Sequence, residues 1–252
     1  MPDPISAAIQ LDSVIKRYGD TLAVDGLTLS IPRGELFAFV GPNGAGKTTT
    51  IKMIAGLLRP DAGEIHLCGH AMHRNGQAAK SVIAYVPDQP FLYDKLTGRE
   101  FLHFVARMYG VKPERRDAVL TELNTRFQMA GFLDKMTEDY SHGMKQKVVI
   151  AAALLHAPEV LVIDEPMVGL DPKTVREVKD LFTSQVRRGG TVFMSTHTLE
   201  VAEAIADRIG IINRGQLIAA GTMSELRALA DRSQSLEEIF LELTEEEDEP
   251  TR

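Results

Sequence analysis

The sequence predicts an α/β fold in which a parallel sheet is covered by helices on both faces. On either side of a central stretch, short apolar runs alternate with segments of helical periodicity. The run at 36–40 is apolar throughout, as expected of a strand that is buried on both faces. Residues 90–158 show helical spacing only, so we expect a helical insertion into the sheet.

The segments before this insertion are predicted to be mostly strands, because their apolar residues alternate or are β-branched. The expected strands cover residues 9–15, 22–31, 36–40, 64–67 and 82–86, with one helix over 48–57.

Within the insertion, apolar side chains at helical spacing predict three helices, over 97–109, 113–129 and 141–156. The alternation then returns, in the order strand 160–163, helix 172–187, strand 191–194, helix 199–207 and strands between 209 and 219. A surface helix over 235–246 is expected to run into an acidic tail.

Composition excludes several classes of protein. The chain has 252 residues, 44% hydrophobic and 25% charged, which argues against a disordered or fibrous chain. A lone Cys68 cannot form an intrachain disulfide or a zinc cluster and favours a reducing compartment. The longest aliphatic run, 148–155, has 8 residues, well short of the ~20 that cross a bilayer. The N-terminus lacks the pattern of a secretory signal, so we expect a soluble cytosolic protein.

The net charge of −7 is unevenly distributed. Residues 245–249 contribute five negative charges, and we expect this run to be a solvated tail, the alternative being a docking site. The remainder of the chain offers no general attraction to nucleic acid, so no nucleic-acid partner is expected.

The strongest motif is a phosphate-binding loop that follows the strand at 36–40 and opens a helix. The segment Gly41-Pro42-Asn43-Gly44-Ala45-Gly46-Lys47-Thr48 fits G-x-x-x-x-G-K-[ST]. Its glycines allow successive backbone N–H groups to point into one concavity, above a helix N-terminus. Lys47 is expected to contact the β- and γ-phosphates of a nucleotide, and the Thr48 hydroxyl to bind Mg²⁺.

An apolar strand that ends in two carboxylates predicts the catalytic side of the same site. Asp164 and Glu165 follow the strand at 160–163, and carboxyl ends of parallel strands face the ligand crevice. We expect Asp164 to hold Mg²⁺ and Glu165 to orient or deprotonate the attacking water. His197 follows the strand at 191–194 and is expected to contact the γ-phosphate or Glu165.

In this order along the chain, the motifs resemble those of the ATP-binding subunits of ABC transporters. Residues 41–48 are similar to the Walker A motif, with Thr49 beside it, and 160–165 to Walker B. The other matching segments are Tyr18 as the adenine-stacking aromatic, Ser141, His142, Gly143 and Met144 as the signature, Asp171 in the D-loop, and His197 as the switch histidine. Tyr18 has a second interpretation, as an ordinary aromatic at a strand end.

Two segments depart from the family pattern. The signature has His142 in place of its first glycine and Met144 in place of its glutamine. The resemblance puts Asp88 at the position of the Q-loop glutamine, with Gln89 one residue later. Either could reach Mg²⁺ or the attacking water, and we favour Gln89; the alternative is that both are ordinary surface-turn residues. Phe91, Leu92 and Tyr93 follow, where such subunits dock a permease, although these side chains could equally be core residues.

The resemblance implies a P-loop NTPase fold with a RecA-like parallel sheet, an N-terminal antiparallel β subdomain and an inserted helical subdomain. It divides a single domain into a core (1–90 and 158–222), a helical signature subdomain (91–157) and a C-terminal extension (223–252). It further implies ATP and Mg²⁺ as ligands, and Glu165, His197 and Lys47 as catalytic residues.

The same resemblance implies the assembly in which the chain works. ATP on one subunit is capped by the signature of another, either a second copy or a different ATPase subunit. The pair is expected at the inner face of the cell membrane, driving an integral membrane permease, and the sequence favours an exporter. The alternatives are an ABC ATPase that acts on nucleic acid or ribosomes, or a GTPase or kinase that shares only the phosphate loop. No N-K-x-D guanine motif is present.

Overall fold

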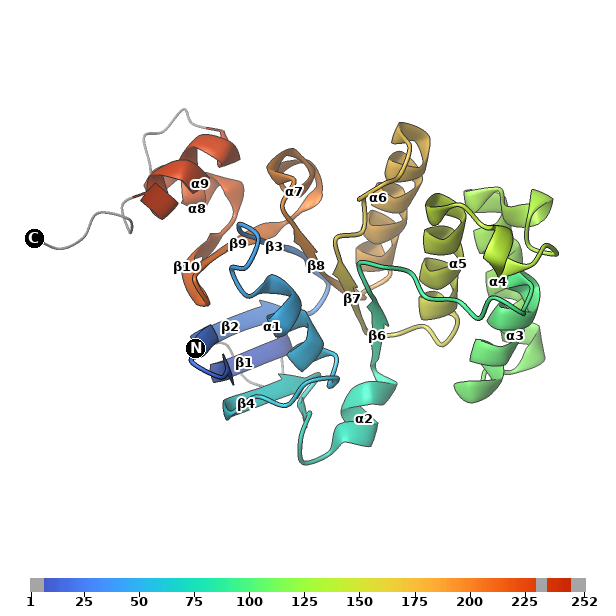
Figure 1. The fold of residues 1–252 in the computed structure, drawn as a ribbon, viewed down its shortest axis with the longest axis horizontal. Helices are drawn as coiled ribbons and strands as arrows, with labels where there is room; N and C mark the ends of the chain where they lie inside the picture. The colour runs from blue at the N-terminus through green and yellow to red at the C-terminus, as the bar shows by residue number, and fades with distance from the viewer. Residues whose placement is uncertain (1–6, 230–234, 246–252) are drawn as a thin grey trace, which may run out of the picture.

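The computed structural model describes residues 7–229 and 235–245, and within them two sheets lie at the centre (Figure 1). The six-stranded sheet has the order β10-β9-β3-β8-β7-β6, and all its neighbours are parallel except the β9–β10 hairpin. Its strands are β3 (Leu36–Val40), β6 (Ile83–Val86), β7 (Val160–Asp164), β8 (Thr191–Thr196), β9 (Arg208–Asn213) and β10 (Gln216–Gly221). The predicted parallel sheet is therefore confirmed.

The second sheet is antiparallel and is built mostly from the first 67 residues. Its order is β2-β1-β4-β5, with bounds β1 (Ala7–Tyr18), β2 (Thr21–Pro32), β4 (Ala62–Leu67) and β5 (His70–Ala71). Cys68, in the turn between β4 and β5, is half buried, and burial raises the pKa of its thiol to about 11.

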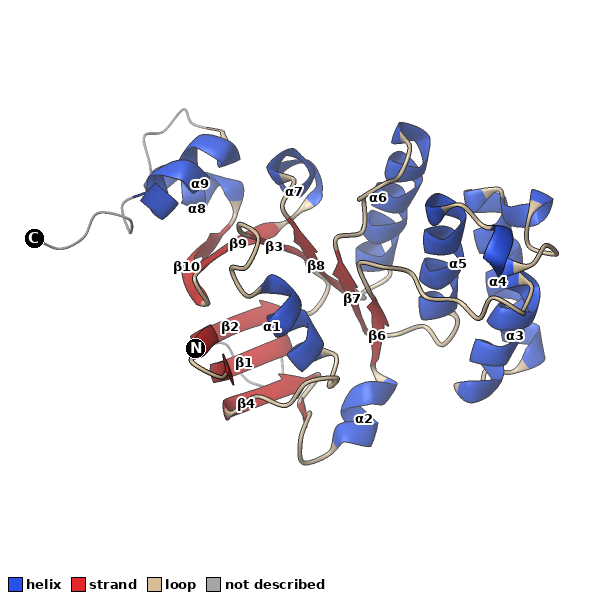
Figure 2. Ribbon diagram, viewed as in Figure 1, coloured by secondary structure: helices blue, strands red, loops and turns tan. Residues whose placement is uncertain are grey.

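Helices cover both faces of the parallel sheet and extend to one side of it (Figure 2). They are α1 (Lys47–Ile54), α2 (Gly76–Ser81), α3 (Gly98–Met108), α4 (Pro113–Phe127), α5 (His142–Leu154), α6 (Pro172–Arg187), α7 (Leu199–Ile205), α8 (Met223–Leu229) and α9 (Leu236–Glu245). Two short 3₁₀ turns, Met129–Gly131 and Thr137–Asp139, join α4 to α5.

The alternation of side chains along the strands gives each face of the parallel sheet its own hydrophobic core. On one face, Phe37, Phe39 and Phe193 pack with α1 and the antiparallel sheet. On the other face, Ala38 and Met194 pack with α5, α6 and α7. The rings of Phe37 and Phe193 are stacked, with centroids 5.8 Å apart. A strand buried on both faces, as predicted for 36–40, is thus observed.

The predicted helical insertion is present as α3, α4 and α5, which lie beside the sheet at the β6 edge (Figure 1). α2 was not predicted, because only Ala79 of its six residues is buried and no apolar period marks it. The predicted acidic tail lies outside the described residues except for its first member, Glu245. Among the described residues, no helix is long and apolar enough to cross a bilayer.

Candidate functional site

The loop between β3 and α1 can be formed only by glycine at two of its positions. Gly46, which precedes α1, has φ +107°, and a Cβ there would lie 2.4 Å from the carbonyl oxygen of Ala23. A Cβ on Gly41 would lie 2.3 Å from the carbonyl oxygen of Ile212. These close approaches hold the loop against neighbouring strands, with the α1 N-terminus directed at the space above it.

Lys47 is buried at the first position of α1 and donates within the loop itself. Its Nζ donates to the carbonyl oxygens of Gly41 at 2.7 Å and Pro42 at 3.0 Å. Burial lowers the pKa of the ammonium group, while Glu165 and Asp164 nearby oppose that shift. The ammonium group is therefore close to both acids. Its N–H groups, which now donate to loop carbonyls, can donate to an anion instead.

Asp164 ends β7 and is almost fully buried. In the sheet register it faces Ser195 on β8, whose hydroxyl donates to the Asp164 carboxylate. Burial raises the pKa of Asp164, and the hydroxyls of Ser195 and Thr48 work against that shift. Ser195 was not predicted as a site residue. Its signal in the sequence is its place two residues before His197, at the end of a buried strand.

Glu165 and His197 form a pair at the rim of the sheet. The Glu165 backbone has φ +48°, a left-handed conformation that is rare for residues with a side chain. Its N–H points at both the carbonyl oxygen and the hydroxyl of Ser195, each at 3.2 Å. The Glu165 Oε1 lies 2.9 Å from Nδ1 of His197, as expected for one of the two predicted contacts of this histidine.

A pocket of about 390 Å³ gathers most of these groups. Predicted residues that line it are Asn43, Gly44, Gly46, Lys47, Thr48, Thr49, Glu165 and His197, and it is also lined by Ala23, Asp88 and Val168. Tyr18 does not line it; this half-exposed ring lies at the end of β1, with Nζ of Lys16 5.8 Å from its centroid. The pocket therefore joins the phosphate loop to the two strand ends that the sequence indicated.

Asp88 lines two neighbouring pockets, whereas Gln89 lines one of them. Asp88 lines the pocket with Lys47 and Thr48, and its charge contributes to raising the pKa of Asp164. Gln89 lines only the neighbouring pocket, together with His142 and Lys145. The carboxylate therefore lies nearer to the phosphate loop than the amide that we favoured from the sequence.

The signature segment, residues 141–144, does not line the pocket of about 390 Å³ described above, here called the nucleotide pocket. Ser141 caps α5, accepting from the backbone N–H of Met144 at 3.3 Å. Asp171 likewise caps α6: it accepts from the hydroxyl of Thr174 and from the N–H groups of Thr174 and Lys173, and these bonds lower its pKa. Both residues thus stabilise the start of a helix, and neither lines the nucleotide pocket.

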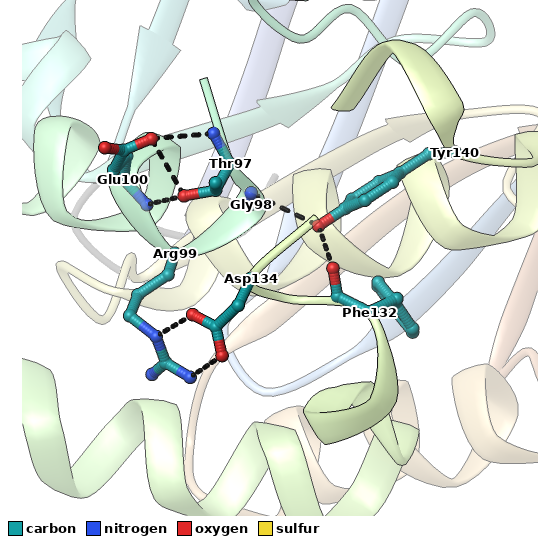
Figure 3. A network of polar contacts seen from close by, with 7 residues as sticks. All are labelled: Thr97, Gly98, Arg99, Glu100, Phe132, Asp134 and Tyr140. Atoms are coloured by element: carbon teal, nitrogen blue, oxygen red, sulfur yellow. Dashed lines mark hydrogen bonds and ion pairs between the residues drawn. The ribbon is translucent and has the colours of Figure 1, made fainter. Parts of the chain in front are cut away.

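Tyr140 anchors the segment that leads into Ser141 (Figure 3). Its hydroxyl accepts from the N–H of Gly98 at 3.2 Å and donates to the carbonyl of Phe132 at 2.7 Å. A Cβ on Gly98 would lie 2.4 Å from that hydroxyl oxygen. In the same network Thr97 and Glu100 form a capping box at the start of α3, and Arg99 pairs with Asp134 through two hydrogen bonds.

Four large apolar side chains form an exposed surface, here called the aromatic patch, between the loop after β6 and α3. Its members are Phe91, Tyr93, Phe104 and Met108, with exposed fractions of 71%, 47%, 40% and 70%. Tyr93 holds the patch together through edge contacts with Phe91 and Phe104, with centroids 5.8 and 5.7 Å apart. Leu92, between them, is buried. The two interpretations of 91–93 thus apply to different residues: Leu92 belongs to the core, and its neighbours are exposed.

Comparison with known proteins agrees with this architecture. The family model described as ABC transporter matches residues 24–168. The chain is 42% identical to the daunorubicin resistance ATP-binding protein DrrA3 of Streptomyces coeruleorubidus, covering 88% of this chain and 70% of the relative. It is 38% identical to the Nod factor export ATP-binding protein I of Paraburkholderia xenovorans, covering 88% and 73%.

A solved structure described as the ATP binding subunit of an ABC transporter superposes with a TM-score of 0.90 at 34% identity, covering 94% of this chain and 99% of the other. The P-loop NTPase fold and the family that the motifs resembled are both confirmed. The chain belongs to the ABC transporter family, as an ATP-binding and ATP-hydrolysing subunit.

Proposed function

We propose that this chain hydrolyses Mg²⁺-bound ATP between two ATPase subunits and thereby drives export through a separate integral membrane permease. One observation carries the proposal. The pocket gathers the phosphate loop, Glu165 and His197, while Ser141 lies outside it on the N-terminus of α5. A helix N-terminus whose capping serine can still donate its O–H is suited to bind phosphate, and a second subunit can bring it to this pocket.

The phosphates of ATP would bind to the loop 41–48. The Nζ of Lys47 now donates to two loop carbonyls, and the β- and γ-phosphate oxygens are better acceptors for it because they are charged. The N–H groups at the start of α1, including those of Thr48 and Thr49, supply further donors.

The oxygen atoms around Thr48 fit a magnesium ion. The Thr48 hydroxyl lies near the Asp164 carboxylate, and Asp88 adds a second carboxylate to that side of the pocket. Such hard oxygen ligands are those that Mg²⁺ prefers, usually shared with substrate phosphates and water. Among the described residues, no three His, Cys, Asp or Glu side chains are placed to hold a metal by themselves. When bound, the ion would neutralise charge on the transferred phosphoryl group.

Glu165 is the residue we assign to the attacking water. Its Oε1 lies 2.9 Å from Nδ1 of His197, and its Oε2 accepts, at 3.4 Å, from the backbone N–H of the same residue. These contacts fix the carboxylate at the pocket wall, where it can accept a proton from water in line with the γ-phosphate. His197, half exposed, would in turn contact the γ-phosphate.

We assign the aromatic patch to the permease. It exposes large apolar side chains next to Asp88 in the chain, so an occupant of the patch can influence the pocket through the loop that joins them. Binding there would hold the chain at the inner face of the cell membrane. The core (1–90 and 158–222) and the helical part (91–157) would then move as separate subdomains.

The direction of transport is proposed from the relatives, which are named for drug resistance and for Nod factor export. Their names also favour a transporter subunit over an ATPase that acts on nucleic acid or ribosomes. The transported substrate would be selected by the permease.

Gel filtration tests the two-subunit site. Glu165→Gln protein should elute as a dimer with Mg²⁺ and ATP and as a monomer without them. Adding Ser141→Arg should abolish that dimer and leave ATP binding intact, because Ser141 lies outside the pocket of its own chain. Dimers that persist in the double variant, or a Glu165→Gln protein that never dimerises, would contradict the proposal. Lys145→Glu, on the next turn of α5, is the control: it also changes the charge near the signature, but at a residue outside 141–144.

A further inference from the structure

His142 departs from the family pattern, and its ring contacts the loop that follows Glu165. Its Nε2 lies 3.1 Å from the carbonyl oxygen of Val168. A carbonyl oxygen only accepts, so Nε2 must carry the hydrogen in this contact. A glycine at position 142 has no side chain and could not form this hydrogen bond.

The ring of His142 also packs against Gly169. This glycine has φ +71°, and a Cβ built on it would lie 3.1 Å from Cδ2 of His142. One residue further in both segments, a Cβ on Gly143 would lie 3.7 Å from a Leu170 methyl group. The first turn of α5 and residues 168–170 are therefore in contact along two successive residues.

Val168 connects this contact with the nucleotide pocket. It lines that pocket with Lys47 and Glu165, and it also lines the neighbouring pocket of about 470 Å³ with His142. Its backbone N–H points at the carbonyl oxygen of Glu165 at 3.4 Å. The backbone of Val168 is thus in contact with Glu165 through its N–H and with His142 through its carbonyl oxygen.

We propose that His142 is a positioning residue, which fixes residues 165–170 against the start of the signature helix and so aligns the Glu165 carboxylate. The inference rests on the proposed function, in which Ser141 and the N-terminus of α5 face the ATP of the other subunit. Displacement of α5 by that ATP is then passed through His142 to the catalytic carboxylate of the same chain. ATP bound at one site would therefore affect the alignment of the catalytic carboxylate at the other site.

Two amide variants separate the hydrogen bond from other effects of the side chain. In His142→Gln the side-chain nitrogen lies about as far from Cα as the ring Nε2, so it can donate to Val168. In His142→Asn the nitrogen lies near the place of the ring Nδ1 and falls short. His142 is exposed, so neither variant threatens the fold.

The turnover of these variants is the functional readout. Losing one hydrogen bond that aligns Glu165 should lower kcat of His142→Asn about threefold to tenfold. The KM for ATP should stay within about twofold, because His142 does not line the nucleotide pocket of its own chain and the variants leave Ser141, which would face the other subunit's ATP, unchanged. His142→Gln should keep at least about half of the wild-type kcat. An equal loss in both variants, or a change in KM alone, would overturn the proposal.

A double-mutant cycle on the nucleotide-free chain tests the contact without any need for a second subunit. Gly169→Ala presses on the ring of His142 and also strains the backbone, whereas in a His142→Gly background only the strain remains. The two substitutions should therefore be coupled by about twofold or more in the equilibrium constant of unfolding. Additive effects would overturn the contact itself. Failure of the Glu165→Gln protein to dimerise would contradict the proposed function, whereas the result of this cycle would be unaffected.

Discussion

Nδ1 of His197 lies 2.9 Å from Oε1 of Glu165, although 31 residues separate them along the chain. The two side chains come from the ends of β8 and β7, which are neighbours in the parallel sheet. A carboxylate held in this way keeps one orientation at the pocket wall and remains accessible to water.

Glu165→Gln should abolish turnover and leave ATP binding intact. The amide keeps the shape of the side chain but cannot accept a proton, so kcat should fall at least about 100-fold. ATP affinity, measured by titration calorimetry, should change by less than about twofold, because the loop 41–48 is unchanged. Glu200→Gln, an exposed acid at the start of α7, is the matched control and should hydrolyse ATP normally. Normal hydrolysis by the Glu165 variant would remove its catalytic role.

Lys47→Ala should lose ATP affinity and ATPase activity together. The substitution removes a buried ammonium that would donate to charged phosphate oxygens, so the Kd for ATP should rise about tenfold to 100-fold. Lys52→Ala, near the other end of α1, should bind ATP as the wild type does. Equal affinity in the two variants would count against the phosphate-loop assignment.

Tyr140→Phe should destabilise the fold, because it deletes a hydroxyl that satisfies two backbone groups. The N–H of Gly98 and the carbonyl of Phe132 would lose this partner, at a cost of about 1–3 kcal/mol in the free energy of unfolding. Urea denaturation measures that loss. Tyr93→Phe, on the exposed aromatic patch, should change stability by less than about 0.5 kcal/mol. Similar values for the two variants would show that the Tyr140 hydroxyl contributes nothing.

The environment of His156 leads us to expect that the free energy of unfolding decreases as the pH falls. Its ring stacks on Tyr109 with centroids 4.0 Å apart, its Nε2 contacts the carbonyl of Ile83, and no partner is seen for its buried Nδ1 among the described residues. Burial lowers the pKa of this imidazole in the folded state. The unfolded chain therefore binds the proton at a higher pH than the folded chain, and stability decreases as the pH drops through the ordinary histidine range.

The comparison with His156→Phe isolates this effect, because the variant keeps a ring against Tyr109 and does not titrate. Between about pH 7.5 and 5.5, the wild type should lose more free energy of unfolding than the variant. Chemical denaturation at a series of pH values measures both slopes. Parallel slopes would mean that His156 takes up its proton equally in both states.

The sequence predicted best those parts of the site that depend on local backbone. Gly46 and Lys47 follow directly from the phosphate-loop pattern, since the close approach to Ala23 requires glycine and the helix start fixes the lysine. Ser195 was missed, because its bond to Asp164 depends on the register between β7 and β8, which no local pattern encodes.

Loops with few apolar residues were predicted less well. The direction of a side chain after β6 depends on packing against other segments, so the pattern around Pro87 could not decide between Asp88 and Gln89. The six residues of α2 were missed for a related reason: a single buried alanine gives no period. Outer elements of this kind are set by the surface on which they rest.

The half-buried Cys68 has a practical consequence for spectroscopy on this protein. Because burial raises its pKa, this thiol is less ionised at neutral pH than an exposed one, and only the thiolate reacts quickly with maleimides. Fluorophores or spin labels could therefore be attached to newly introduced exposed cysteines while the native thiol stays largely unlabelled. Distances between such probes would follow the motion of the signature helix in an otherwise unmodified chain.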